Sequence, residues 1–265
     1  MRPGDPIQWY PGHMAKAMRR LAEDLRIANL VIEVVDARVP QSGTNPHLRT
    51  LLGKRPCIRV LAREDLADPH ATRSWLARFA QESLSAIALD AKRRFGIVHL
   101  QKLIEETSAS THTKARRIIV VGIPNAGKST VINALVGRSI ARAEDRAGVT
   151  RAPQWFRIGP QSEVMDTAGI LAPSIDTREA QWRLAIVGAV PRARYDAEEV
   201  VANFSAWCRR RGTGIYAEVP DLESYAQTRG FVRHGMLADV HNAAWSYLKD
   251  VSDLKFGRIT LEFPT

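Results

Sequence analysis

Short runs of β-branched and other apolar residues alternate with helical patterns over the first two-thirds of the chain. This alternation is typical of a parallel sheet that helices cover on both faces. We predict six strands, over residues 29–36, 56–62, 85–89, 117–123, 154–158 and 162–165. The spacing of apolar residues between the strands predicts helices near 14–28, 70–82, 96–107 and 127–136. The expected fold class is therefore α/β.

The strand signal stops near residue 175, and helical periodicity replaces it. Asp196 occupies an N-cap position with Glu199 three residues later, and Gly212 ends the pattern. The face of this helix that we expect to be buried carries Val200, Val201, Phe204, Trp207 and Cys208. A second helix near 234–249 aligns Leu237, Val240, Ala244 and Leu248. We predict a sheet domain over residues 1–175 and a small all-helical domain over residues 176–265.

The sharpest chemical signal is the segment from Gly122 to Ser129, which reads G-x-x-x-x-G-K-S between an expected strand and an expected helix. Its backbone N–H groups and the helix N-terminus are expected to hold phosphates. Lys128 should reach the β- and γ-phosphates and assist catalysis, and Ser129 should bind Mg²⁺. The alternative is an ordinary glycine-rich turn. The residues predicted here to bind nucleotide are Pro124, Asn125, Ala126, Gly127, Lys128, Ser129 and Thr130.

A second motif, Asp166-Thr-Ala-Gly169, follows the strand expected near 162–165 and has the D-x-x-G arrangement of GTP switch proteins. Asp166 is placed to hold Mg²⁺ through water, and Gly169 to sense the γ-phosphate. Thr150 lies in the polar loop between the two motifs and is the candidate for a second Mg²⁺ ligand; a plain loop threonine is the alternative. The two motifs together predict a nucleoside triphosphate site with Mg²⁺.

The segments that would read the base lie in an unusual place. A guanine-reading N-K-x-D segment normally follows the D-x-x-G motif in this fold, but nothing after residue 169 supplies one. Upstream, one expected strand ends in Ala62-Arg63-Glu64-Asp65 and the next in Asp90-Ala91-Lys92. These segments stand where N-K-x-D and S-A-K would stand, although before the phosphate-binding loop. The residues predicted to contact the base are Ala62, Arg63, Asp65, Asp90, Ala91 and Lys92.

The formal net charge of +10 indicates a polyanionic partner. Residues 176–265 hold 12 Lys/Arg and 12 Asp/Glu, which leaves 26 against 16 for residues 1–175. Several basic clusters together favour nucleic acid, although each run taken singly is typical of a solvated face. No apolar stretch has the length of a membrane span or the form of a signal peptide, and the two distant cysteines suit reduced thiols. We expect a cytoplasmic protein without membrane contact.

The order of base-reading segments, phosphate-binding loop and switch motif resembles that of the circularly permuted GTPases of the ribosome biogenesis GTPase A family. Trp9-Tyr-Pro-Gly-His-Met14, Asp36-Ala-Arg-Val-Pro40 and Gly257-Arg-Ile-Thr-Leu261 resemble the same family, and the likeness covers nearly the whole chain. It implies a circularly permuted Ras-like P-loop GTPase domain with a six-stranded, mostly parallel sheet, followed by a C-terminal helical domain that touches ribosomal RNA. It also implies a GTPase that converts GTP to GDP with Mg²⁺ on the precursor of the large ribosomal subunit, late in its maturation, with turnover stimulated by the ribosome.

One departure from the family pattern concerns the base site, where Ala62 and Arg63 replace Asn and Lys and only Asp65 is retained. The Asp65 carboxylate can accept the N1–H and N2–H₂ donors of guanine, which adenine cannot offer. Loss of the Asn amide should cost about 1–3 kcal/mol where its partners stay buried and unpaired. Stacking of Arg63 on the purine would offset part of this cost. We predict guanine binding that is weaker or less selective than the family norm.

The group that positions the attacking water is not the usual glutamine, since Ile170 and Leu171 follow Gly169. We therefore expect slow unstimulated turnover. His13 resembles the family's N-terminal histidine near the γ-phosphate and is the catalytic candidate; the alternative is a histidine that anchors its own turn. Asn125 is similar to the asparagine of relatives activated by a monovalent cation, which makes K⁺ a candidate cofactor.

Other functions remain open on these residues. An RNA-binding scaffold with a degenerate, weakly hydrolysing nucleotide site is the main alternative, motivated by Ala62 and the missing glutamine. A small-molecule kinase would need a lid and an acceptor pocket, for which the sequence offers no segment. We expect a monomer, and we interpret Asp36, Arg38 and Pro40 as structural residues that shape the loop after the first strand.

Overall fold

The fold is that of a computed structural model, which describes residues 7–8, 11–53, 55–109, 116–137, 155–167, 174–175, 177–232 and 238–264. Six strands form one sheet in the order β4-β3-β2-β5-β7-β6. The strands are β2 (Leu30–Asp36), β3 (Cys57–Ala62), β4 (Ser85–Leu89), β5 (Arg116–Val121), β6 (Trp155–Arg157) and β7 (Ser162–Asp166). β6 pairs antiparallel with β7, and the other neighbouring pairs are parallel. The predicted six-stranded, mostly parallel sheet is confirmed.

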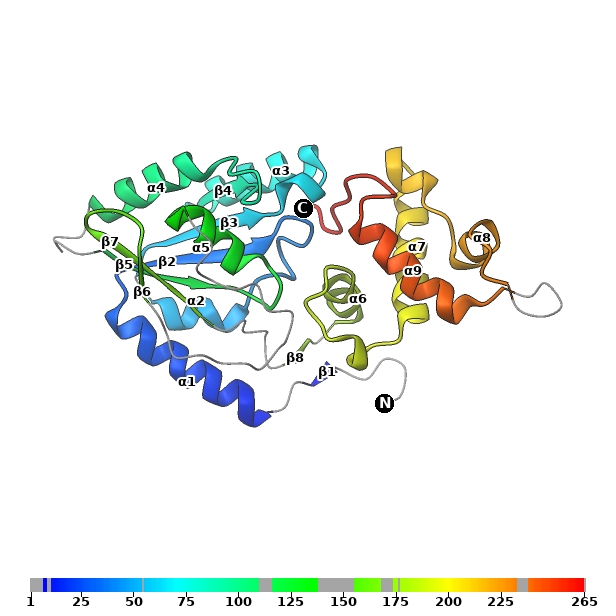
Figure 1. Cartoon of the computed structure of the whole chain (residues 1–265), viewed down its shortest axis with the longest axis horizontal. Helices are drawn as coiled ribbons and strands as arrows, with labels where there is room; N and C mark the ends of the chain where they lie inside the picture. Colours follow the sequence, from blue (N-terminus) through cyan, green and yellow to red (C-terminus); the bar gives the residue numbers. More distant parts are fainter. Residues whose placement is uncertain are drawn as a thin grey trace.

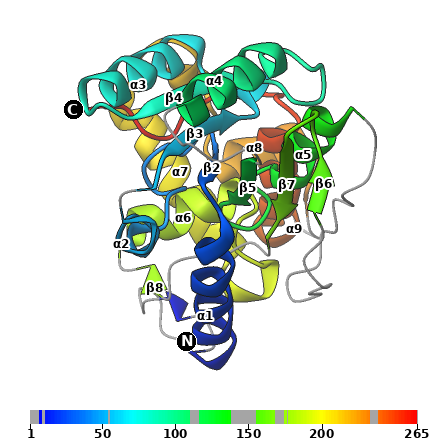
Figure 2. The ribbon, with the colours of Figure 1, turned by 90° about the vertical axis from the view of Figure 1, so that its left-hand side faces the viewer.

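Helices cover both faces of this sheet, with α2 and α3 on one side of the strands and α4 and α5 on the other (Figure 2). The helices are α1 (Pro11–Ile27), α2 (Pro46–Leu52), α3 (Pro69–Gln81), α4 (Ile97–Ala109) and α5 (Lys128–Val136). On one face, Val31 and Val35 of β2 pack into clusters with residues of α1, α2 and α3, and on the other face Ile32 and Val34 pack with α4 and α5. All seven residues of β2 are buried, because a central parallel strand is covered on both sides.

Some elements differ from the sequence-based prediction. β5 ends at Val121, two residues before the predicted end, because the backbone of Gly122 (φ 154°) turns out of the sheet there. Helix α2 and the antiparallel pair of β1 (Ile7–Gln8) with β8 (Ser174–Ile175) are absent from the prediction. Helix α2 has seven residues, which is too short for a helical period to stand out, and β1 and β8 have two residues each.

The rest of the described chain is helical and gathers at one end of the molecule (Figure 1). We call residues 177–256 the helical tail. Within 177–232 and 238–264 the structure has no β-strand, apart from an isolated bridge between Val232 and Ala238. The helices are α6 (Arg178–Ile186), η2 (Arg192–Arg194), α7 (Ala197–Arg211), η3 (Gly214–Glu218), α8 (Leu222–Thr228) and α9 (Val240–Ser252), where η marks a 3₁₀-helix.

The predicted start of α7 is confirmed, because the Asp196 carboxylate accepts hydrogen bonds from the backbone N–H groups of Glu198 (2.8 Å) and Glu199 (3.1 Å). Trp207, predicted on the buried face, is half-buried: it packs against the core, and its ring stacks on Phe263. The second predicted helix corresponds to α9, which begins later because Asp239 caps it. The predicted contact residue Leu237 lies outside the described residues.

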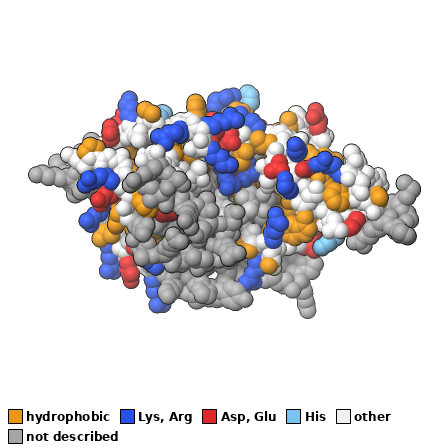
Figure 3. Space-filling model, viewed as in Figure 1, with side chains coloured by type: hydrophobic (Ala, Val, Ile, Leu, Met, Phe, Trp, Pro, Cys, Tyr) orange, Lys and Arg blue, Asp and Glu red, His pale blue; other side chains and the backbone are white. Residues whose placement is uncertain are grey.

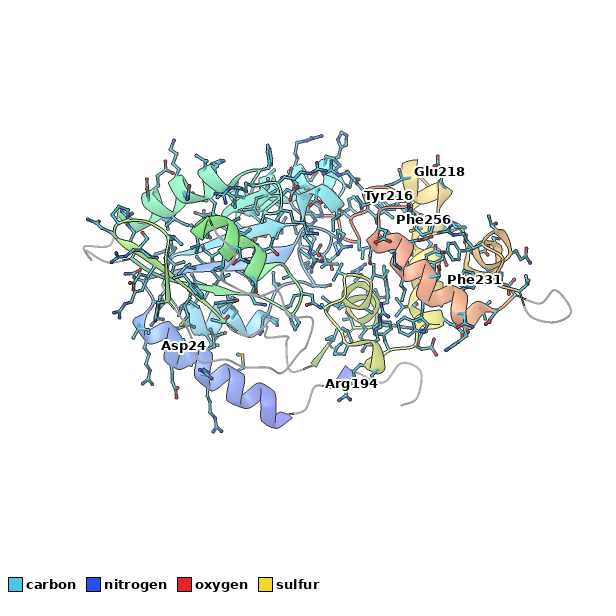
Figure 4. All side chains as sticks on the ribbon, in the orientation of Figure 1. Asp24, Arg194, Tyr216, Glu218, Phe231 and Phe256 are labelled. Carbon is cyan, nitrogen blue, oxygen red and sulfur yellow. The ribbon has the colours of Figure 1, made fainter. Side chains whose placement is uncertain are left out.

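The end of the chain returns from the helical tail to the sheet (Figure 1). We call residues 257–264 the C-terminal arm. The backbone N–H of Leu261 in the arm donates to the carbonyl of Arg38, just after β2, at 2.8 Å. On the other side of the arm lies Tyr216 of η3 (Figure 4). Its hydroxyl donates to the carbonyl of Thr260 and accepts from the Thr260 N–H, each at 3.1 Å. The arm therefore joins the helical tail to the sheet.

The described part of the chain contains neither a disulfide framework nor a helix that could span a membrane. Among the described helices, none combines the length and hydropathy that crossing a membrane requires. Cys57 in β3 and Cys208 in α7 form no disulfide, in agreement with the sequence-based interpretation. Burial raises the pKa of the Cys208 thiol to about 12, which marks it as an unreactive core residue.

Candidate nucleotide-binding site

The phosphate-binding loop joins β5 to α5 through two glycines in conformations that other residues rarely adopt. Gly122 has φ 154°, and a Cβ added there would lie 2.2 Å from the carbonyl oxygen of Val34 in β2. Gly127 has φ 101° and stands at the N-cap of α5. These positions require glycine, because any side chain would strain the backbone or collide with β2. The loop therefore turns tightly and leads directly into the positive end of a helix.

Lys128 is buried at the start of α5, although lysine is usually exposed. Its Nζ donates to the carbonyl of Ile123 at 2.9 Å, so the side chain folds back across the loop. Burial lowers the pKa of Lys128 to about 8, and the nearby Asp166 carboxylate acts in the opposite direction. A buried amine that is bonded to one carbonyl would gain charge-assisted hydrogen bonds from phosphate oxygens. The predicted role of Lys128 in binding the β- and γ-phosphates requires such bonds.

Ser129 and Asp166 lie side by side, as the predicted Mg²⁺ site requires. The Ser129 hydroxyl donates to Oδ2 of Asp166 at 3.0 Å. The other oxygen, Asp166 Oδ1, is buried and has no hydrogen-bond partner among the described residues. Burial raises the pKa of Asp166, against the opposing effects of Lys128 and Ser129. An unsatisfied carboxylate oxygen beside a hydroxyl is a donor set that suits a hard cation, so the arrangement fits Mg²⁺.

The predicted base site and the phosphate-binding loop line one cavity. Because β3, β4 and β5 run parallel in the same sheet, their carboxyl ends meet at one edge (Figure 1). Gly127 and Thr130 of the loop and α5 face this cavity from one side. The residues that line it from β3 and β4 are Ala62, Arg63, Asp65, Leu66, Asp90, Ala91 and Lys92. The residues predicted to contact the base and the residues predicted to contact the phosphates therefore border the same cavity.

Within the base site, Asp90 is turned toward its own loop. Its carboxylate is buried and accepts hydrogen bonds from the backbone N–H groups of Lys92 (3.0 Å) and Arg93 (3.2 Å). This Asx-type turn fixes the loop after β4 and leaves the Lys92 side chain exposed. Asp90 therefore fixes the loop that presents Ala91 and Lys92 to the cavity.

Arg63 makes a contact that the sequence did not indicate. It has a left-handed backbone (φ 58°), and its Nη1 lies 3.4 Å from Oδ2 of Asp36. Asp36 also accepts from the backbone N–H and the guanidinium of Arg38, at 2.9–3.0 Å. Burial alone would raise the pKa of Asp36, but Arg38 and Arg63 together hold it below its usual value. In this structure the Arg63 guanidinium is therefore engaged with Asp36, and the structural role predicted for Asp36 and Arg38 agrees with their burial and pairing.

Other predicted site residues fall differently. The Asn125 amide donates from Nδ2 to the carbonyl of Gly188 in the helical tail at 2.8 Å, which ties the phosphate-binding loop to the tail. His13 is in the first turn of α1, and its side chain lies outside the described part of the structure. Thr150 and Gly169 both lie outside the described residues.

Comparison with known proteins was made against families, curated sequences and solved structures. Residues 117–205 match the family model described as 50S ribosome-binding GTPase. The ribosome biogenesis GTPase A of Priestia megaterium (strain DSM 319 / IMG 1521) is 33% identical to the chain, over 98% of this chain and 97% of its own length. The chain belongs to the ribosome biogenesis GTPase A family. It is accordingly a GTPase that binds guanine nucleotide.

Solved structures agree with membership of the ribosome biogenesis GTPase A family. GNP-bound YlqF from T. maritima superposes with a TM-score of 0.70 and 27% identity, covering 94% of this chain and 98% of its own. The GDP-bound structure of TM YlqF gives a TM-score of 0.71 and 27% identity, covering 93% of this chain and 99% of its own. The circularly permuted GTPase fold predicted for this chain is therefore confirmed.

Proposed function

We propose that this GTPase holds GTP across the phosphate-binding loop and the upstream base site, and hydrolyses it during late maturation of the large ribosomal subunit. The observation that carries the proposal is the single cavity lined by Asp65 and Lys92 from the early strands and by Gly127 and Thr130 from the loop and α5. A nucleotide in that cavity would meet the phosphate-binding backbone with one end and the Asp65 carboxylate with the other. If the two groups lay at opposite edges of the sheet, no single purine nucleotide could reach both.

The base assignment predicts a preference for GTP over ATP. Asp65 offers acceptors to the two donors of guanine, whereas Ala62 supplies no polar side chain. Binding constants for GTP, GDP and ATP, measured by calorimetry, test this assignment. Affinity for ATP as high as that for GTP would remove Asp65 from base recognition.

Mg²⁺ would be held by Ser129 and Asp166, with Thr150 as the proposed further ligand. When bound, the ion neutralises phosphate charge and orients the γ-phosphate for attack by water. The hydroxyl of Ser129 and the unpartnered Oδ1 of Asp166 support this proposal. Ser129→Ala should reduce the gain in GTP affinity that Mg²⁺ gives, while Ser85→Ala on the exposed start of β4 should leave that gain unchanged.

Two further groups are proposed for hydrolysis. His13 is the candidate that acts near the γ-phosphate, and unchanged ribosome-stimulated hydrolysis in a His13→Ala variant would remove it. Asn125 is the candidate ligand of K⁺ through its side-chain oxygen, because its nitrogen already donates to Gly188. Equal rates of hydrolysis in K⁺ and in Na⁺ would exclude this role.

The proposed partner is ribosomal RNA on the large-subunit precursor, which a cytoplasmic monomer would meet. The net charge of +10 supports a polyanionic partner, and Lys and Arg side chains gather near the junction of α3 with the C-terminal arm (Figure 3). The helical tail is proposed as a domain that adds contacts, because a hollow of about 370 Å³ on it is lined by Arg183, Arg210 and Arg211. Hydrolysis measured with and without large subunits tests the proposal. Identical rates would favour the alternative, an RNA-binding scaffold with a weakly hydrolysing site.

A further inference from the structure

The loop that carries Asp65 is held by the far end of the chain. We call residues 63–68 the Asp65 loop; it contains the 3₁₀-helix η1 (Glu64–Leu66). Arg258 in the C-terminal arm donates from Nη2 to the carbonyl of Glu64 at 2.6 Å and from Nε to the carbonyl of Ala67 at 2.9 Å. Arg258 lies more than 190 residues later in sequence than either acceptor. The guanidinium therefore spans the loop on both sides of Asp65.

Two neighbours of Arg258 contact the same loop. The backbone N–H of Ile259 donates to the carbonyl of Leu66 at 3.2 Å, and the Thr260 hydroxyl accepts from the backbone N–H of Asp68 at 3.0 Å. The next arm residue, Leu261, is held by the sheet through its hydrogen bond to the carbonyl of Arg38. Three consecutive arm residues are thus hydrogen-bonded to the Asp65 loop between Glu64 and Asp68.

The loop depends on such support because its own structure is weak. A single 3₁₀ turn has poor hydrogen-bond geometry. Inside the loop, Leu66 N–H donates to the carbonyl of Arg63 (2.9 Å) and Ala67 N–H to that of Glu64 (3.2 Å). The turn is entered through the left-handed backbone of Arg63 (φ 58°), a conformation that carries strain for a residue other than glycine. The direction in which Asp65 points is therefore set from outside the loop.

Arginine is suited to this position by its shape. Its planar guanidinium carries donors in a fixed fork, so one side chain can hold two carbonyl oxygens at a defined separation. A lysine ammonium is a point donor on a flexible stem and cannot hold both carbonyls with the same geometry. Because both acceptors are backbone atoms, Arg258 acts on the path of the loop and leaves the Asp65 carboxylate available to a ligand.

We propose that Arg258 is a positioning residue for guanine recognition, which fixes the Asp65 loop so that the Asp65 carboxylate meets the base edge. This inference rests on the proposed function, in which Asp65 reads guanine. It gives a role in nucleotide selection to the segment Gly257-Arg-Ile-Thr-Leu261. Because Ala62 replaces the family's asparagine, Asp65 is the one residue of this segment expected to select guanine. The position of Asp65 therefore matters more than in the family pattern.

The test compares the affinities of the full-length chain for GTP, ITP and XTP by calorimetry. ITP lacks the 2-amino group of guanine, so the ratio of GTP to ITP affinity isolates one of the two contacts expected of Asp65. Arg258→Ala should lower GTP affinity and reduce that ratio by about tenfold, which corresponds to about 1.4 kcal/mol. Arg258→Lys should fall between Arg258→Ala and the unaltered chain. Lys255→Ala, which removes an exposed charge from the neighbouring segment, should change neither affinity nor ratio.

Asp65→Asn is the reference that separates the two claims. An asparagine can donate to the 2-carbonyl of xanthine, so this variant should lose GTP affinity and gain XTP affinity. If it does not, Asp65 does not read the base, and both the proposed function of Asp65 and the positioning role are wrong. If it does, but Arg258→Ala and Arg258→Lys keep the unaltered ratio of GTP to ITP affinity, the positioning role alone is wrong. A decrease of both affinities by the same factor also overturns it, because that result indicates general loss of structure.

Discussion

Lys128, Ser129 and Asp166 share a half-buried corner where β5, α5 and β7 meet, and their charges are only partly balanced there. The Lys128 pKa is lowered and the Asp166 pKa is raised, each chiefly by burial. Ser129 satisfies one oxygen of Asp166 and leaves the other without a partner among the described residues. Such a corner is poised to receive a triphosphate and a cation together, since each supplies the charge that the other lacks.

The glycine at the start of the loop gives the first prediction. Gly122→Ala should lower the free energy of unfolding by about 3 kcal/mol, because the new Cβ would lie 2.2 Å from the carbonyl of Val34 at a φ of 154°. Urea denaturation measures the change. Nucleotide affinity should fall as well, since β5 and the loop must shift away from β2.

Gly159→Ala is the matched control for this prediction. Gly159 lies in the turn between β6 and β7, and a Cβ there would meet no atom within 4 Å. Its free energy of unfolding should change by less than about 0.5 kcal/mol. Equal stability of the two variants would show that the loop and β2 do not approach as closely as described.

At the residue scale, the sequence predicts roles that depend on neighbouring residues and misses contacts between residues that are far apart along the chain. The eight-residue motif from Gly122 to Ser129 indicates its own chemistry, because its roles follow from backbone geometry and adjacent side chains. The engagement of Arg63 with Asp36 depends on two strands that meet only in the folded sheet. Arg258 is farther still from its acceptors in sequence, and the resemblance of its segment to a family was the one available signal.

At the scale of elements, the C-terminal arm connects the helical tail to the sheet by hydrogen bonds on both of its sides. Its inner side meets the Asp65 loop, and its outer side meets η3 through Tyr216. The tail is tied to the phosphate-binding loop independently, through Asn125 and Gly188. A shift of the helical tail would therefore displace both the Asp65 loop and the phosphate-binding loop.

Tyr216 gives a prediction for the arm. Tyr216→Phe should lower the free energy of unfolding by about 1–2 kcal/mol at neutral pH, because the backbone carbonyl and N–H of Thr260 lose a buried partner. Chemical denaturation measures this difference. Tyr195→Phe, a tyrosine whose ring packs on Trp245, should change the free energy by less than about 0.5 kcal/mol.

The same variant carries a pH prediction. Burial raises the pKa of Tyr216 to about 12, and its hydrogen bond with Thr260 acts in the opposite direction. Between pH 10 and 12 the folded chain therefore keeps a proton that the unfolded chain has lost, so stability falls as pH rises. The difference in stability between the unaltered chain and Tyr216→Phe should shrink over this range. A constant difference from pH 8 to pH 12 would mean that the hydroxyl is not buried as described.

The elements that the sequence predicts are those long enough to show a period. The strands of the main sheet stand out as runs of apolar residues, and helices α1, α3, α4, α5, α7 and α9 stand out by their helical periods; each of these elements is found. Helices α2 and α8 have seven residues, about two turns, which is too little for a helical period to stand out. Helix α6 has nine residues, and its buried residues are nearly consecutive in the sequence, so no helical spacing distinguishes it from a loop.

At the scale of the whole molecule, the helical part of the chain has no net charge but still carries a concentrated group of basic residues. The neutral count of residues 176–265 hides one dense cluster, Arg209 to Arg211, at the exposed end of α7. Two of these arginines line the hollow on the helical tail together with Arg183 and Trp207. Composition alone could locate the excess of positive charge in residues 1–175. It could not reveal that the tail gathers its own arginines around a concave surface.

This arrangement predicts how RNA binding should respond to salt. The logarithm of the affinity for single-stranded ribosomal RNA should fall linearly with the logarithm of salt concentration, as counterions are released from phosphates. Replacing Arg209, Arg210 and Arg211 together by alanine should reduce the slope by about 2, since each lost phosphate contact removes ~0.7. Fluorescence anisotropy titrations over a range of salt concentrations measure both slopes.

A second triple variant removes the same charge elsewhere on the tail. Arg178, Arg192 and Arg229 are dispersed, and Arg178 and Arg229 already pair with Glu199 and Asp250. Their replacement by alanine should change the slope less than loss of the cluster does. Equal slopes for the two variants would mean that net charge alone, and not the cluster, governs RNA binding.

The central claim is that one guanine nucleotide spans segments that lie far apart and in permuted order along the chain. The measurement that tests it most directly is a crystal structure of the chain with a non-hydrolysable GTP analogue and Mg²⁺. The account predicts the triphosphate against the loop at Lys128 and the guanine edge within hydrogen-bond distance of the Asp65 carboxylate. A bound analogue whose base lies away from Asp65, with Ala62 and Lys92 left uncovered, would contradict it.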